Sequence, residues 1–178
     1  MKKSILIFSL VVNTLLFCKA SMANDAATLD PKIAMFANYI GTWESTFKME
    51  NNKPKIVDVA NWQRALNGKA IRTLHSINDG EYGGESLIFW DSAQNKIVFY
   101  YFTTASFFTN GYIEVINEHS FVAYEDVSGS KQGITKVKST STLLDNKMQV
   151  STSYFKNGTW TEPESRVYKP SNKAVNFK

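Results

Sequence analysis

The chain has 178 residues, a formal net charge of +4, a single cysteine and 13% aromatic residues. This length suits one domain of ordinary size. The small charge, without a run of basic residues, gives no support to a nucleic-acid partner.

The first 23 residues have the layout of a secretory signal peptide. Two lysines precede an apolar stretch from Ile5 to Phe17, and the small residues Ser21 and Ala23 stand where a signal peptidase requires them. We therefore predict cleavage after Ala23, a periplasmic or secreted protein, and one mature domain over residues 24–178. The apolar stretch is shorter than the ~20 residues of a membrane-spanning helix, so we expect no integral membrane segment after signal removal.

The only cysteine, Cys18, lies inside this segment. Lipid attachment to Cys18 is an alternative that the preceding Phe17 disfavours, since a small residue is expected there. The mature domain would have no disulfide, thiolate nucleophile or cysteine metal site. Loss of three lysines with the signal would lower the net charge from +4 to +1.

The segment from Pro31 to Ile40 has the features of a short helix. Asp30 can cap its start, Pro31 suits the first helical position, and Gly41 follows its end. Its apolar residues have the spacing of one α-helical stripe: Ile33, Phe36, Ala37 and Ile40. A helix this short must dock on other elements to persist.

Ten stretches of alternating apolar and polar residues follow, which is the pattern of half-buried strands. We expect two-residue hairpin turns at Asn67-Gly68, Asp145-Asn146 and Asn157-Gly158. The predicted strands are Trp43–Met49, Ile56–Leu66, Ala70–Ile77, Glu85–Trp90, Lys96–Thr104, Tyr112–Ile116, Phe121–Val127, Gly133–Leu143, Lys147–Phe155 and Thr159–Tyr168.

No helical pattern separates these strands, so the chain predicts an all-β meander. Closure removes the two exposed edges of such a sheet, which favours an antiparallel up-and-down barrel of about ten strands with room for one small ligand. The stretch Ile97–Phe102 is apolar on both faces. Its outward face would need a cover, either the Pro31–Ile40 helix or a second subunit in a homodimer.

Several short motifs resemble those of the calycin superfamily, the lipocalin-like β-barrels, and in particular secreted bacterial families of it without an established activity. The motifs are Gly41-Thr42-Trp43, Leu66-Asn67-Gly68-Lys69, Phe89-Trp90-Asp91 and Asn157-Gly158-Thr159-Trp160. The resemblance implies that Trp43 packs beneath Arg166 as a cation–π contact that closes the barrel. The chain departs from true lipocalins because it lacks their disulfides and their second Thr-Asp-Tyr motif.

An interior ligand site would be lined by aromatic side chains, with a polar group to orient the ligand. His75 shares a strand face with Ile71, Thr73 and Ile77, while Arg72 faces the other way. His75 could bind a ligand, act as a general base or be a core histidine. The candidate ligand contacts are Trp62, Arg72, His75, Phe89, Phe99, Tyr101 and Tyr112. The same aromatic residues could instead fill a packed interior.

No metal site or cofactor is expected. His75 and His119 are the only histidines, and neither belongs to a paired metal-ligand spacing. Haem would need an axial ligand on the inner wall, for which His75 is the one candidate.

These observations leave three functions open. The first is an exported barrel that binds a small hydrophobic or amphipathic molecule. The second is an enzyme on the same barrel, of isomerase, cyclase or decarboxylase type, whose mark would be a buried titratable pair near His75 or Tyr101. The third is a packed, dimeric interaction protein without a ligand. No residue is assigned a catalytic role.

Overall fold

A computed structural model describes residues 28–47, 55–130 and 132–178. The predicted signal peptide and the end of the first predicted strand lie outside these ranges. The strands are β1 (Gly41–Phe47), β2 (Ile56–Ala65), β3 (Ala70–Ile77), β4 (Tyr82–Asp91), β5 (Lys96–Thr103), β6 (Phe108–Asn117), β7 (Ser120–Asp126), β8 (Ile134–Leu144), β9 (Lys147–Lys156), β10 (Thr159–Trp160) and β11 (Glu164–Pro170).

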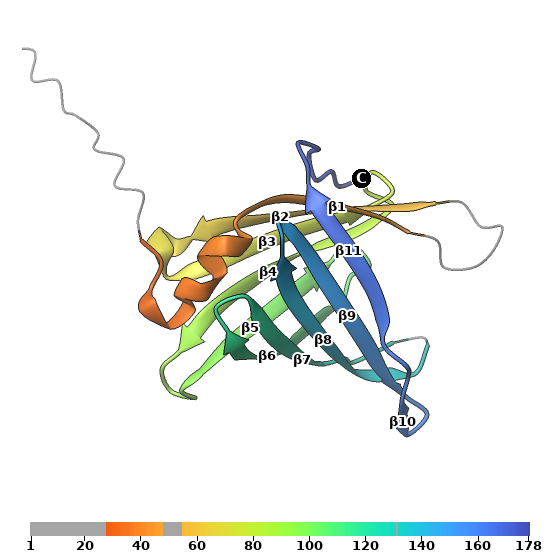
Figure 1. Ribbon diagram of the computed structural model, residues 1–178. Coiled ribbons are helices and arrows are strands. Elements are labelled where there is room, and N and C mark those ends of the chain that lie inside the picture. The colour runs from red at the N-terminus through yellow and green to blue at the C-terminus, as the bar shows by residue number, and fades with distance from the viewer. Residues whose placement is uncertain (1–27, 48–54, 131) are drawn as a thin grey trace, which may run out of the picture.

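The sheet closes into a ten-stranded antiparallel barrel (Figure 1). Strands β1 to β9 each pair with the next one along the chain, β9 pairs with β11, and β11 returns to β1. Closure leaves these ten strands without a free edge. The predicted all-β up-and-down barrel is confirmed.

The prediction of one final strand over Thr159–Tyr168 is wrong, because this segment forms two separate strands, β10 and β11. The short β10 forms a hairpin with β9 alone, and β11 begins only at Glu164. Pro163 lies in the break and has no N–H to donate to a neighbouring strand. The protein therefore carries a small hairpin that projects beyond the barrel wall (Figure 1).

The predicted turns are mostly confirmed. Asp145-Asn146 and Asn157-Gly158 join their strands as two-residue turns with positive φ at both positions. The turn at Asn67-Gly68 is longer than predicted, because a 3-10 turn, η2 (Leu66–Gly68), and Lys69 separate β2 from β3.

The predicted helix forms as η1 (Pro31–Tyr39), a 3-10 helix capped by the Asp30 carboxylate. A 3-10 helix has three residues per turn, so its buried residues are Ile33, Phe36 and Tyr39, all 0% exposed. The predicted α-helical stripe is therefore wrong at Ala37, which faces solvent. In the described ranges no helix combines the length and apolar character that crossing a membrane requires.

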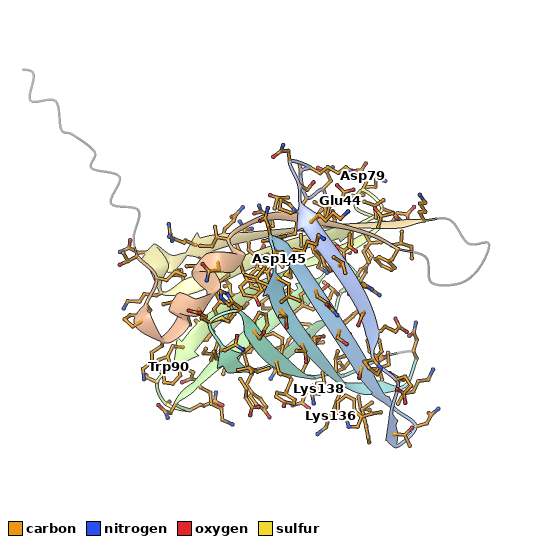
Figure 2. The ribbon with its side chains drawn as sticks, viewed as in Figure 1. Glu44, Asp79, Trp90, Lys136, Lys138 and Asp145 are labelled. Atoms are coloured by element: carbon orange, nitrogen blue, oxygen red, sulfur yellow. The ribbon has the colours of Figure 1, made fainter. Side chains whose placement is uncertain are left out.

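Helix η1 closes one end of the barrel (Figure 1). Phe36 and Tyr39 insert between Trp62 and Phe121, with ring centroids 5.2 to 6.2 Å apart. Trp90 lies at the same end of the barrel (Figure 2), with the Lys32 ammonium 4.7 Å from its ring centroid. This aromatic cluster joins the helix to the core of the barrel.

The helix therefore does not cover the outward face of β5, so the prediction that the Pro31–Ile40 helix covers this face is wrong. On that face Val98 is buried, but Tyr100 and Phe102 are 41% and 52% exposed. The second predicted cover, another subunit, stays a prediction.

Candidate functional site

The end of the barrel opposite η1 is hollow. A cavity of about 650 Å³ lies there, bordered by the β5–β6 and β7–β8 connections. A smaller cavity of about 190 Å³ lies deeper, against Trp62 and Phe121 of the closed end. Tyr101 and Glu125 line both cavities, so these two side chains mark the point where the cavities meet.

Two glycines leave room for the inner aromatic rings. A Cβ on Gly84 would collide with the Tyr101 ring, and a Cβ on Gly111 would lie 2.9 Å from the Phe99 ring. Each glycine stands on a strand adjacent to the ring that it accommodates. The missing side chains therefore let both rings lie close against the barrel wall.

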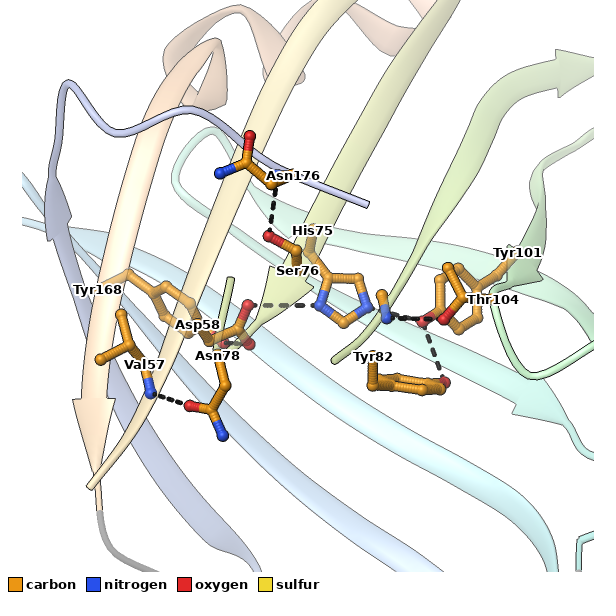
Figure 3. A network of polar contacts seen from close by, with 11 residues as sticks. Val57, Asp58, His75, Ser76, Asn78, Tyr82, Tyr101, Thr104, Tyr168 and Asn176 are labelled. Carbon is orange, nitrogen blue, oxygen red and sulfur yellow. Dashed lines mark hydrogen bonds and ion pairs between the residues drawn. The ribbon is translucent and has the colours of Figure 1, made fainter. Parts of the chain in front are cut away.

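A chain of polar side chains crosses the interior near this cavity (Figure 3). His75 Nε2 lies 2.6 Å from the Tyr101 hydroxyl, and His75 Nδ1 lies 3.3 Å from Asp58 Oδ1. The Tyr168 hydroxyl donates to Asp58 Oδ2 at 2.9 Å, and the hydroxyls of Tyr101 and Tyr82 are 3.2 Å apart. Five strands supply these residues: β2, β3, β4, β5 and β11. Tyr168 of β11 reaches Asp58 because β11 closes the barrel against β1.

The geometry allows a defined direction of proton donation. If Nδ1 of His75 donates to the Asp58 carboxylate, Nε2 is left to accept the Tyr101 hydroxyl proton. Burial raises the pKa of Tyr101, so a free phenolate is disfavoured there. A proton could still pass through Tyr101 to His75 without a phenolate being formed.

Glu125 is a second titratable group at the cavity. Its carboxylate accepts a hydrogen bond from the Thr109 hydroxyl, and burial raises its pKa. Glu125 follows Phe121 and Ala123 on the inward face of β7. Its remaining exposed surface lies in the cavity, where a ligand could reach it.

Four of the predicted ligand contacts face the barrel interior. Phe99, Tyr101 and Trp62 line the deeper cavity, and Tyr101 also lines the larger one. His75 contacts the Tyr101 hydroxyl but does not itself line either cavity.

The other three predicted contacts face outward, which corrects their assignment to the interior. Strand alternation decides this, because Thr73, Ile88 and Ile113 beside them point inward. On the outer face, Arg72 forms a bidentate ion pair with Glu85. Phe89 stacks on Tyr100, and Tyr112 stacks on Tyr124.

The predicted contact between Trp43 and Arg166 is also corrected. The antiparallel β1–β11 register pairs Trp43 with Pro170. Arg166 is four residues before Pro170, so it lies level with Phe47, four residues after Trp43. There its guanidinium lies 3.9 Å from the centroid of Phe47. Trp43 is buried at the closed end instead, where its indole N–H donates to the Tyr39 carbonyl at 2.8 Å.

Several site residues were missed by reasoning from the sequence, although part of the signal was present. Asp58 lies four residues before Trp62, and Glu125 lies four residues after Phe121, so strand alternation places each on the inward face. Tyr82 and Tyr168 carried no such signal, because their roles depend on which strands close the barrel.

The described residues contain no group of three or more His, Cys, Asp or Glu side chains that could hold a metal ion. His119 lies in an exposed turn beside Glu118. Both ring nitrogens of His75 contact other side chains, so neither is aimed at the cavity as a haem ligand.

No family model matches this chain. No curated protein matches it significantly. Thirteen chains of solved structures do match. One is the crystal structure of Rv2717c from M. tuberculosis, with a TM-score of 0.56 and 8% identity, over 81% of this chain and 99% of that chain. At this identity the similarity supports the barrel fold alone.

Proposed function

We propose that this protein is an exported calycin-like barrel that binds one small hydrophobic or amphipathic molecule in its interior. The observation that carries the proposal is the cavity of about 650 Å³ beneath the β5–β6 and β7–β8 connections. Its volume lies within the range of small-molecule pockets. The calycin resemblance and the signal-like first 23 residues support the family and the export.

The lining suits an amphipathic ligand. Phe107, Val127, Ile134 and Val137 supply apolar surface to the larger cavity. The carboxyl of Glu125 and the hydroxyls of three tyrosines provide a few polar partners, in the proportion typical of ligand pockets. An apolar body would fill the cavity while a polar end contacts these groups.

Titration with N-phenyl-1-naphthylamine, an uncharged dye that fluoresces in apolar surroundings, tests the binding. We expect saturable binding at one site per chain. Val137→Trp should remove it, because the indole would fill the cavity from β8. The matched control is Lys138→Trp, the next residue on β8, whose side chain is exposed on the outer face (Figure 2). Absence of saturable binding, or equal binding by Val137→Trp, would overturn the proposal.

A second candidate function, proton transfer on a bound carbonyl compound, is favoured by the Asp58–His75–Tyr101 chain. The Tyr101 oxygen would take a proton from a carbon next to the carbonyl as its own proton passes to His75. The released electron pair would move to the carbonyl oxygen, and return of the proton to another carbon would complete an isomerisation. Asp58 would stabilise the imidazolium formed on the way.

Deuterium exchange into 2-tetralone, followed by NMR in D2O, tests this candidate. The wild-type protein should accelerate the exchange, and Tyr101→Phe should abolish it. Tyr100→Phe is the control, because Tyr100 is the neighbouring tyrosine on the outer face of β5. Equal exchange with and without protein would exclude the proton transfer and leave the binding proposal intact.

A further inference from the structure

Glu125 is the acidic side chain that both cavities share. The Thr109 hydroxyl, only 2% exposed, donates to its carboxylate from the neighbouring strand β6. A carboxylate inside a barrel is stable only when a compensating charge or several hydrogen bonds replace the lost water. A single neutral hydroxyl compensates it poorly, and burial accordingly raises the pKa of Glu125.

Within residues 28–47, 55–130 and 132–178, no lysine or arginine lies within ion-pair distance of Glu125. The Arg166 guanidinium lies over the Phe47 ring and 4.0 Å from the Glu164 carboxylate. The described side chains therefore leave this carboxyl group without a cationic partner.

Aromatic rings stand around the same space. Tyr82, Tyr101, Phe107 and Tyr154 all line the larger cavity with Glu125. The faces of such rings attract organic cations, and the attraction is stronger where water is excluded. A half-buried acid among aromatic rings is thus complementary to a cation with an apolar body.

We propose that the interior selects ligands that carry a protonated amine, with the ammonium group against Glu125 and the tyrosine rings and the apolar body in the rest of the cavity. This inference rests on the proposed binding function and names its ligand class. A neutral alcohol would lack the ion pair with Glu125. A carboxylate ligand would place a second negative charge beside this residue.

Isothermal titration calorimetry with three probes of similar size tests this preference for amines. Tryptamine, tryptophol and indole-3-propionate share one ring and differ mainly in the end group. We expect tryptamine to bind about tenfold more tightly than tryptophol, which corresponds to one modest charge-assisted contact. Indole-3-propionate should bind most weakly.

Variants of Glu125 assign the preference to this residue. Glu125→Gln should lower the tryptamine affinity to that of tryptophol while tryptophol binding stays unchanged. Glu125→Asp retains the charge and should keep a preference for the amine. Asp126→Asn is the matched control, because it removes the same charge from the next residue of β7, which is exposed on the outer face.

Equal affinity for tryptamine and tryptophol, a preference for the acid, or an unchanged amine preference in Glu125→Gln would each overturn the inference. The uncharged dye separates this result from a failure of the binding proposal. If the dye binds and the amine is not preferred, only the ligand class is wrong. If neither the dye nor any indole probe binds, both proposals fall.

Discussion

The two ends of the barrel use the same strands for opposite purposes. At the closed end, η1 inserts Phe36 and Tyr39 among Trp62 and Phe121, and these two side chains of the helix are fully buried. At the other end no helix enters among the described residues, and a cavity of about 650 Å³ remains. A barrel of this size is therefore solid only where another element supplies side chains to fill it.

The two ends also differ in the kinds of side chain that they contain. The closed end is made of aromatic packing with a few hydrogen bonds, such as those from the Tyr39 hydroxyl to the carbonyls of His119 and Ser141. The hollow end contains the Asp58–His75–Tyr101 chain and Glu125. No buried side-chain N or O atom of the described residues lacks a hydrogen-bond partner. Aromatic packing and buried polar groups are thus separated along the barrel axis.

The largest effect is expected from Phe36→Ala at the closed end. Loss of this fully buried ring should lower the free energy of unfolding by about 3–5 kcal/mol, because it removes packing from three aromatic neighbours and leaves a cavity. Urea unfolding followed by circular dichroism measures the change. Phe102→Ala, at a half-exposed site on β5, should cost far less. Similar losses in the two variants would show that the helix does not consolidate that end.

An intermediate effect is expected from Tyr168→Phe in the hollow half. The substitution removes the hydroxyl that donates to buried Asp58, and should cost about 1–3 kcal/mol of unfolding free energy. Urea unfolding at neutral pH checks it, with Tyr100→Phe on the outer face as the control. An unchanged stability would mean that Asp58 is held by His75 alone.

The smallest effect, with the opposite sign, is expected from Glu125→Gln. Burial raises the pKa of Glu125 in the folded chain, so the unfolded chain loses this proton at lower pH and stability declines as the pH rises through that range. Glutamine removes the loss and keeps an acceptor for Thr109. We expect a gain of roughly 1 kcal/mol at pH 7 and none below the unfolded pKa of the carboxyl group.

Urea unfolding at pH 7 and pH 4 measures that gain, with Asp126→Asn as the control for lost charge. A destabilised Glu125→Gln, or the same gain at both pH values, would show that Glu125 is not an uncompensated acid inside the barrel. The proposed selection of amines by Glu125 would then lose its physical basis.

Much of the fold could be predicted because strand signals are local. Alternation located the strands, and Asp145-Asn146 and Asn157-Gly158 specified their turns through residues that tolerate positive φ. The site was harder. Trp62, Phe99 and Tyr101 could be placed inside, but Phe89 and Tyr112 were put on the wrong face because aromatic residues occupy both faces of these strands.

By itself, the sequence of this protein determined an antiparallel meander with a short helix before it, since periodicity, caps and turn residues act over a few neighbouring positions. Three further features follow from contacts between elements far apart in the chain. These are the barrel end that η1 fills, the placement of Arg166 over Phe47, and the meeting of Asp58, His75 and Tyr101. The placement of Arg166 depends on the register between β1 and β11, which closure of the barrel sets. The other two features depend on packing between separate elements, which no local pattern encodes.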